Sequence, residues 1–147
     1  MIRDLAKGFT MHAAETLCKD ASYIPEEKLC SCPEISGKSV IVILDEIVNG
    51  NYKIAAAFRG EDYQEKIGET DLEKLKGLVI SSAEEVCKAI DSLTDEQLAG
   101  LIKMPWGQEF PGAAAIFLPS SHMNYHDGQI NYIQLLLGDT KFHWLEG

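Results

Sequence analysis

The chain has 147 residues, of which 46% are hydrophobic and 24% charged, and a formal charge of −10. Length and composition predict one globular domain over residues 1–147 and argue against disorder. The excess of 23 acidic over 13 basic residues argues against nonspecific binding to nucleic acid or to anionic membranes, since both need clustered cations.

The first 37 residues predict a helix followed by a loop. Leu5, Phe9 and Thr16 fall on one helical face near the start of the chain. Pro25 and the turn-rich stretch before position 38 interrupt this pattern, so residues 22–37 are expected to be mainly loop.

Two further helices are predicted before residue 91. The second covers about residues 38–58 and ends near Gly60, which suits a helix C-terminus. A capping-box pattern from Thr70 to Glu73 opens the third helix, which extends to about Ile90. The apolar stripes of these helices include Ile43, Ile47 and Ile54 in the second, and Leu72, Leu75, Val79 and Val86 in the third.

The remaining sequence predicts a short helical turn, a loop and one more long helix. A Thr-x-x-Gln pattern at residues 94–97 indicates the turn, and prolines and glycines within residues 103–112 indicate the loop. The last helix covers about residues 113–137 and ends at Gly138, with Pro119 either kinking it or marking its true start.

Four long amphipathic helices in one small domain predict an all-α fold, an antiparallel four-helix bundle. The predicted connections are longer than the usual 2–8 residues between neighbouring bundle helices, so a crossover topology is allowed. No apolar run approaches the roughly 18 residues that span a bilayer, and the first residues lack the apolar core of a signal peptide. We therefore expect a cytoplasmic protein.

His122 and His126 are the strongest candidates for chemistry. They lie four residues apart on the last predicted helix, so both imidazoles project from the same side and can bind one metal ion. The same face continues through Gln129 and Ile133, which places the pair toward the bundle interior. A hydrogen-bonded histidine pair without metal is the alternative interpretation.

A third ligand is expected from the second helix. At about 100° per residue, Glu46 lies about 60° from Ile43 and borders the apolar stripe, whereas Asp45 lies nearly opposite. An acid at the border of a buried face is costly unless it is paired, and a bound cation would pair it. Two histidines and one carboxylate leave open coordination positions, as in catalytic metal sites.

The segment from His122 to Gln129, His-Met-Asn-Tyr-His-Asp-Gly-Gln, resembles the last helix of the DinB-like (damage-inducible) superfamily. The stretch around Glu46 is also similar. The resemblance implies a four-helix bundle with crossover topology, commonly a homodimer, that holds zinc or nickel through three histidines. His122 and His126 match the last two ligands, whereas Glu46 replaces the first histidine. Asp127 replaces the usual arginine and is expected on the outer side of the helix.

The resemblance also implies a function. It suggests a metal-dependent enzyme of the thiol S-transferase or hydrolase kind, with a small-molecule substrate such as a low-molecular-weight thiol. The alternative is a non-catalytic metal-binding or stress-associated dimeric protein. Groups that could support the metal are Gln129, Asn49, Tyr52, His12 and Glu15, while His143 has no evident partner and Trp106 is expected to anchor a loop.

Overall fold

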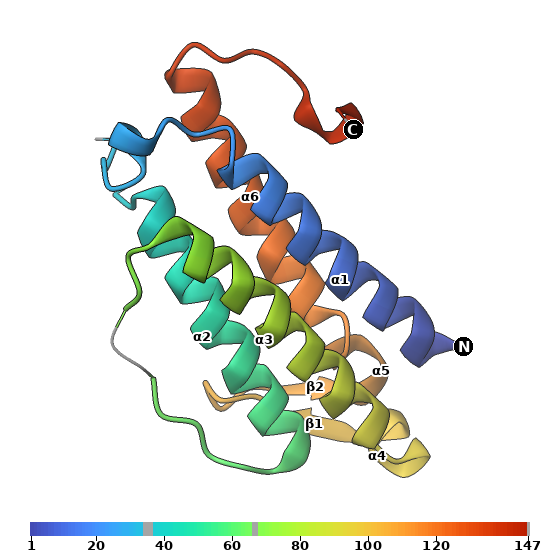
Figure 1. Cartoon of the computed structure of the whole chain (residues 1–147). Helices are drawn as coiled ribbons and strands as arrows, with labels where there is room; N and C mark the ends of the chain where they lie inside the picture. Colours follow the sequence, from blue (N-terminus) through green and yellow to red (C-terminus); the bar gives the residue numbers. More distant parts are fainter. Residues whose placement is uncertain (34–36, 66–67, 147) are drawn as a thin grey trace.

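The computed structural model describes residues 1–33, 37–65 and 68–146. Four long helices form a bundle: α1 (Ile2–Ala21), α2 (Val40–Arg59), α3 (Leu72–Ser92) and α6 (Leu118–Leu136) (Figure 1). The shorter elements are η1 (Glu26–Lys28), α4 (Asp95–Ala99), β1 (Leu101–Lys103), β2 (Glu109–Pro111), α5 (Gly112–Ala115) and η2 (His143–Leu145). The predicted all-α bundle is confirmed. The antiparallel hairpin of β1 and β2, at one end of the bundle, was not predicted from the sequence.

The bundle has crossover topology, as predicted. Helices α1 and α2 each pack between α3 and α6. Two of the four contacts, α1 with α3 and α2 with α6, are antiparallel, whereas α2 and α3 run parallel, as do α1 and α6 (Figure 1). Because α2 and α3 point the same way, the connection between them has to return along the length of the bundle.

Local signals explain most helix ends. Gly60 adopts a left-handed conformation with φ of 69° and ends α2, as predicted. The capping box of Thr94 and Gln97 at the start of α4 is also present. Helix α3 begins one residue later than predicted, because Asp71 rather than Thr70 caps it by accepting a hydrogen bond from a backbone N–H of its first turn.

The last predicted helix is divided in two. Pro119 lies in the first turn of α6, where its missing N–H costs no helical hydrogen bond, so it marks the true start of that helix. Gly112, at the start of α5, packs so closely on α4 that a Cβ atom there would lie 2.2 Å from the carbonyl oxygen of Gln97. Helix α5 therefore packs closely on α4.

The core contact of α1 is made by small residues. Ala6, Ala13 and Ala14 are fully or almost fully buried, whereas Leu5 and Phe9 are 55% and 50% exposed. Alanines allow α1 to approach its neighbours closely, so the large apolar residues of the predicted face lie outside the core. The fully buried large side chains include Leu17, Ile43, Leu44, Ile47, Leu75, Ile90, Ile116, Met123 and Ile130.

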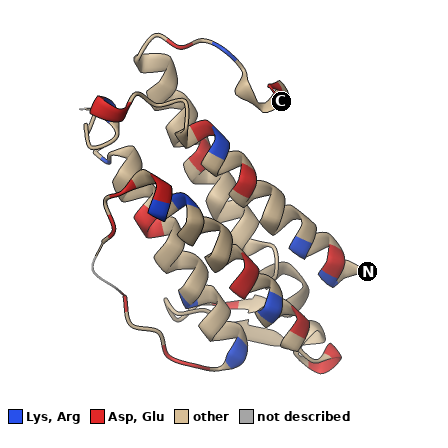
Figure 2. Ribbon diagram, viewed as in Figure 1, with Lys and Arg blue, Asp and Glu red and all other residues tan. Residues whose placement is uncertain are grey.

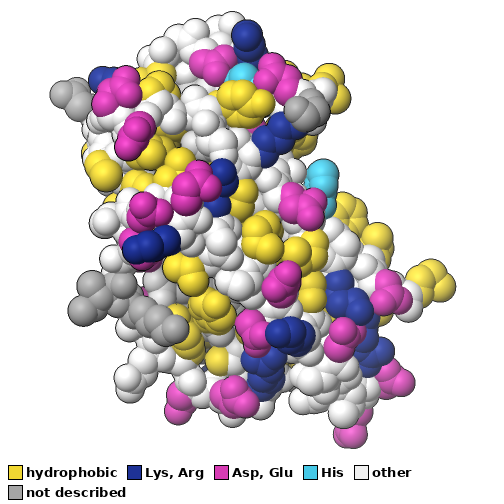
Figure 3. Space-filling model, viewed as in Figure 1, with side chains coloured by type: hydrophobic (Ala, Val, Ile, Leu, Met, Phe, Trp, Pro, Cys, Tyr) yellow, Lys and Arg dark blue, Asp and Glu magenta, His cyan; other side chains and the backbone are white. Residues whose placement is uncertain are grey.

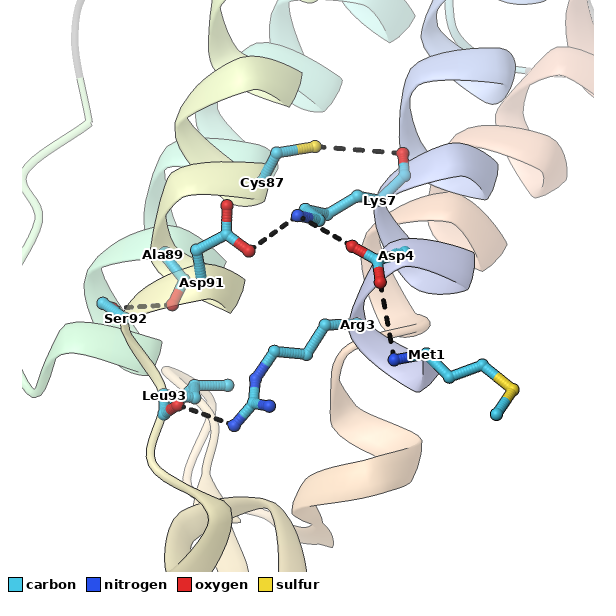
Figure 4. A network of polar contacts seen from close by, with 9 residues as sticks. All are labelled: Met1, Arg3, Asp4, Lys7, Cys87, Ala89, Asp91, Ser92 and Leu93. Carbon is cyan, nitrogen blue, oxygen red and sulfur yellow. Dashed lines mark hydrogen bonds and ion pairs between the residues drawn. The ribbon is translucent and has the colours of Figure 1, made fainter.

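Ion pairs connect the exposed edges of α1 and α3. Lys7 Nζ lies 2.7 Å from Asp91 and 3.3 Å from Asp4, and Arg3 donates to the Leu93 carbonyl oxygen (Figure 4). Arg3 also donates to Asp95. Such exposed pairs each contribute about 0–1 kcal/mol, so they set the alignment of the helices more than their stability.

Charge is distributed unevenly over the helices. Acidic and basic side chains mix along α1, α2 and α3, and Figure 3 shows both signs around small apolar patches on one face. Helix α6 carries no lysine or arginine, and Asp127 is its one acidic residue (Figure 2). No helix in the described part of the chain is long and apolar enough to cross a lipid bilayer.

Candidate metal centre

His122 and His126 lie on the side of α6 that faces α2, and their rings meet. The two Nε2 atoms are 3.0 Å apart, with the rings edge to face. Nδ1 of the buried His126 lies 2.7 Å from Oε1 of Gln129. An amide oxygen only accepts hydrogen bonds, so this contact assigns the His126 proton to Nδ1 and leaves an electron pair on Nε2. A histidine oriented in this way is ready to bind a metal ion through Nε2.

His122 packs directly against α2. A Cβ atom on Gly50 would lie 3.0 Å from Cε1 of His122, so a larger residue there would require the ring to shift. Nδ1 of His122 is buried and has no hydrogen-bond partner among the described residues. Burial, and after it the neighbouring His126, lower the pKa of His122 below its ordinary value. The ring is therefore neutral at pH 7, the form that binds metals.

Glu46 lies one helical turn before Gly50 and thus on the same face of α2. Its carboxylate is half exposed and forms an ion pair with Lys38, with Oε2 and Nζ 2.7 Å apart. The charge of Glu46 also acts on His122 and favours its protonated form. Glu46 therefore lies in the neighbourhood of the two histidines, with its carboxylate bound to a lysine.

The side chain of Asp45 forms its hydrogen bonds away from the two histidines. Its Oδ1 accepts a hydrogen bond from the backbone N–H of Glu69, in the connection between α2 and α3, and its side chain contacts Asn49. The structure thus separates the two candidate carboxylates: Asp45 holds the crossover connection, whereas Glu46 borders the histidine pair.

The structure brings two of the three predicted ligands together. Within residues 1–33, 37–65 and 68–146, no group of three or more histidine, cysteine, aspartate or glutamate side chains is arranged to hold a metal ion. The donors that are present nevertheless suit one, because His122 and His126 are imidazoles whose Nε2 atoms face each other at 3.0 Å. Glu46 would have to leave Lys38 to join them.

The groups that the sequence suggested as supports for the metal lie in different parts of the structure. Gln129 orients His126, as described. Asn49 accepts a hydrogen bond from the Tyr63 hydroxyl, and Tyr52 stacks on the Tyr63 ring, so both contribute to the region around the crossover connection. His12 and Glu15 are exposed on α1.

Asp127 does not lie on the outer side of α6, contrary to the sequence-based expectation. It is 3% exposed and faces α1, where Asp20 is fully buried. Asn131 Nδ2 donates to Oδ2 of both carboxyl groups, at 3.1 Å from Asp20 and 3.2 Å from Asp127. Burial, and after it the Asp20 carboxylate, raise the pKa of Asp127 to about 8. Consecutive residues of α6, at positions 126 and 127, thus serve two different interfaces.

His143 has partners that the sequence did not reveal. Its Nε2 lies 2.8 Å from Asp139 and its Nδ1 2.8 Å from Glu146, and its ring stacks on Tyr23 with centroids 3.5 Å apart. Hydrogen bonds to Asp139 and Glu146 raise the pKa of His143. The two acids lie three and four residues from His143, so the sequence could have suggested these hydrogen bonds. The stacking on Tyr23 joins distant parts of the chain and has no such local signal.

Trp106 and the cysteines are less informative. Trp106 is exposed, lies against Phe110 and lines a surface cavity of about 670 Å³ next to the hairpin. All four cysteines are free thiols; Cys30 and Cys32 are exposed, and burial raises the pKa of Cys18 to about 11. None of these residues adds a ligand to the histidine pair.

Comparison with known proteins places the fold. No family model matches the chain, and no curated protein matches it significantly. The crystal structure of a DinB-like protein from Bacillus subtilis is similar with a TM-score of 0.71 and 17% identity, over 94% of this chain and 95% of that one. A DinB-like protein from Bacillus cereus is similar with a TM-score of 0.68 and 15% identity, over 86% of each chain. The chain therefore has the DinB-like fold, which confirms the resemblance noted in the sequence.

Proposed function

We propose that the protein binds one divalent metal ion, zinc or nickel, through His122, His126 and Glu46. The observation that carries this proposal is the 3.0 Å separation of the two Nε2 atoms, with His126 oriented by Gln129. A buried histidine pair without metal needs a proton between its facing nitrogens, and His122 then keeps a buried Nδ1 without a partner. A metal ion would use the facing electron pairs of both Nε2 atoms, and no proton would then be needed between the two rings.

Glu46 is the third ligand in this proposal. Its partner in the structure, Lys38, is as exposed as Glu46 itself, at 41% for each side chain. An ion pair this exposed contributes about 0–1 kcal/mol, so exchanging Lys38 for a divalent cation costs little. The position of Glu46, one turn before Gly50 and beside His122, also favours it over Asp45.

The chemistry of such a centre follows from its ligands. Two imidazoles and one carboxylate leave coordination positions for a substrate atom or water, and a bound divalent ion would lower the pKa of a thiol or water there. The protein would supply orientation through Gln129 and partial neutralisation through Glu46. We therefore propose a metal-dependent enzyme of the thiol S-transferase or hydrolase kind acting on a small molecule.

A non-catalytic metal-binding or stress-associated protein is the second candidate. Burial of His126, 5% exposed, favours it, because a metal bound deep between α2 and α6 would be shielded from large substrates. The two candidates differ in one measurement: an enzyme admits an exogenous thiol to the metal. Cobalt substitution followed by thiol addition separates them through the appearance of a thiolate-to-cobalt charge-transfer band.

Calorimetric zinc titration of tag-free protein tests the metal site itself. Glu46→Gln is expected to weaken zinc binding tenfold or more, because it removes the anionic ligand, whereas Asp45→Asn leaves the affinity nearly unchanged. Glu46→His should retain the metal. Zinc binding that survives the double substitution His122→Ala/His126→Ala would overturn the proposal, as would loss of binding in Asp45→Asn alone.

We also propose a homodimer formed through α6. An exposed stripe on this helix recurs in alternating steps of four and three residues, the spacing of a helix that packs on another helix. It consists of Ser121, Tyr125, Gly128, Tyr132 and Leu135. The stripe has no charge, so two chains of net charge −10 can meet there with little repulsion.

Sedimentation tests this interface. The wild type is expected to sediment as a dimer at tens of micromolar, and Tyr132→Glu, which places a charge in the stripe, as a 16.3 kDa monomer. Glu96→Gln, an exposed change on α4, serves as the control and should remain dimeric. A monomeric wild type would refute the proposal.

A further inference from the structure

The cavity beside the β1–β2 hairpin has the dimensions of a ligand site. Its volume of about 670 Å³ lies in the range of small-molecule pockets. The last turns of α2, the segment that follows α2 and the turn of the hairpin line it, and none of the three proposed metal ligands is among the lining residues. The cavity is therefore distinct from the histidine pair.

Two aromatic side chains of the lining are held in place by other residues. The indole N–H of Trp106 donates to the side-chain oxygen of Gln108, and the ring is nevertheless 56% exposed. The hydroxyl of Tyr63 donates to Asn49, and its ring stacks on Tyr52. Both rings are thus positioned before a ligand arrives, and they offer it apolar surface at little cost in conformational entropy.

Charged side chains of both signs line the same cavity without pairing. Lys103 lies on β1, and Glu61 and Asp62 follow the end of α2; all three are exposed. None of them forms an ion pair with a residue in the described part of the chain, whereas Lys53, which also lines the cavity, is paired with Glu65. The cavity therefore offers a lysine and two acids that a ligand can engage.

This combination favours a ligand that carries both charges. An anion meets the two acids and the net charge of −10, and a cation meets Lys103 without a counter-charge. A zwitterion is neutral overall and can pair with both kinds of side chain. Because no ion pair joins Lys103 to either acid, the charges of the ligand should also lie apart, as do the ends of a dipeptide, about 7 Å from each other when extended.

We propose that the cavity beside the hairpin binds a dipeptide with an apolar side chain. The carboxylate of the dipeptide pairs with Lys103, and its ammonium group pairs with Glu61 and Asp62. Trp106 contacts the apolar side chain, since a large exposed ring in a fixed position suits such a contact. The site does not depend on the proposed metal centre.

Titration calorimetry with glycyl-phenylalanine tests the site. The matched ligands are its N-acetyl form, which lacks the ammonium group, and its C-terminal amide, which lacks the carboxylate. The dipeptide is expected to bind the wild type with a dissociation constant of about 1 mM or lower. Each blocked form should bind about threefold more weakly or worse, because it loses one set of exposed ion pairs.

Variants assign each charge to its partner. Lys103→Met should abolish the preference for the dipeptide over its amide, and Glu61→Gln/Asp62→Asn the preference over the N-acetyl form. Trp106→Ser should weaken all three ligands. Lys28→Met, which removes an exposed lysine from η1 at the opposite end of the bundle, is the control and should keep both preferences (Figure 1).

The outcomes separate this site from the metal centre. His122→Ala/His126→Ala should bind the dipeptide as the wild type does, whether or not the protein binds zinc. Equal affinity of the wild type for all three ligands would overturn the proposal, as would an unchanged preference over the amide in Lys103→Met. The absence of dipeptide binding at millimolar concentration would also overturn it.

Discussion

Helix α6 presents two bases to one neighbour and one acid to another, where the acid meets a second acid on α1. His122 and His126 face α2, whereas Asp127 faces α1 and meets Asp20. Both interfaces are buried, yet they differ in what they need, because a neutral imidazole is stable in a buried site and a second buried carboxylate is not. The two histidines are stable without a bound cation, whereas the two carboxyl groups always need a proton or a cation between them.

The difference shows that burial alone does not define a site on this helix. His126 is oriented by one neutral amide, Gln129, and the acid pair by another, Asn131. The two amides project from nearby positions of α6 but serve opposite faces. Changes confined to one face should therefore leave the other face unaffected, and the following predictions use that independence.

The largest expected effect is stabilisation by zinc. At a free concentration 100-fold above its dissociation constant, a ligand that binds only the folded state adds about 2.7 kcal/mol to the free energy of unfolding. We expect this gain in the wild type and in Asp127→Asn, and none in His122→Ala/His126→Ala. Thermal unfolding with zinc and with chelator measures it; an equal chelator effect on all three proteins would refute the prediction.

The amides are expected to differ in their structural roles. Asn131→Leu removes the donor shared by two buried carboxyl groups and should lower the free energy of unfolding by about 1–3 kcal/mol. Gln129→Leu should cost less than about 1 kcal/mol but weaken zinc binding by about tenfold or more, because it releases the ring of His126. Urea unfolding and zinc titration of both variants check this; identical behaviour would contradict the separation of the two faces.

A pair of glycine substitutions tests the close approach of α2 and α6. Gly77→Ala, in the exposed part of α3, should stabilise the protein by about 1 kcal/mol, since nothing lies within 4 Å of the added methyl group. Gly50→Ala should not stabilise the protein in this way and should weaken zinc binding, because the methyl group displaces His122. Zinc affinity unchanged in Gly50→Ala would show that His122 is free to move aside.

The smallest expected effect concerns His143 and pH. Its pKa in the folded protein is raised above the ordinary value of 6.5 by Asp139 and Glu146. Its contribution to stability is therefore complete below pH 6.5 and is lost as the pH rises through the folded pKa. Unfolding measurements between pH 5 and 9 should show this decline in the wild type and not in His143→Gln; the same decline in both would assign it to another group.

The sequence predicted the fold well where the signals are local. Helix ends at Gly60 and Gly138 and the capping box at Thr94 depend on neighbouring residues and were correct. Pro119 had two possible roles in the sequence, a kink or a helix start, and the structure shows the second. The hairpin was missed because its strands have three residues each, too few for an alternating pattern. The pairing of His122 with His126 was also accessible, since both lie on one helix.

The sequence did not predict features that depend on packing between distant parts of the chain. The face of α1 is set by alanines, whose burial leaves Leu5 and Phe9 exposed, and large residues mislead a periodicity argument there. Asp127 was expected on the outer side of the helix, but it is 3% exposed. Its burial depends on Asp20, more than 100 residues earlier in the chain, and no local pattern reports such a partner.

The crossover topology also has a consequence for folding during synthesis. Helix α1 needs α6 beside it, and the contacts of Asp20 with Asn131 and Trp144 join residues 111 and 124 positions apart. Contacts between such distant segments slow folding, because the entropy of closing the intervening loop is lost before they form. The alanine face of α1 therefore remains partly uncovered on the ribosome until α6 has emerged, and the nascent chain is a candidate for chaperone protection over that interval.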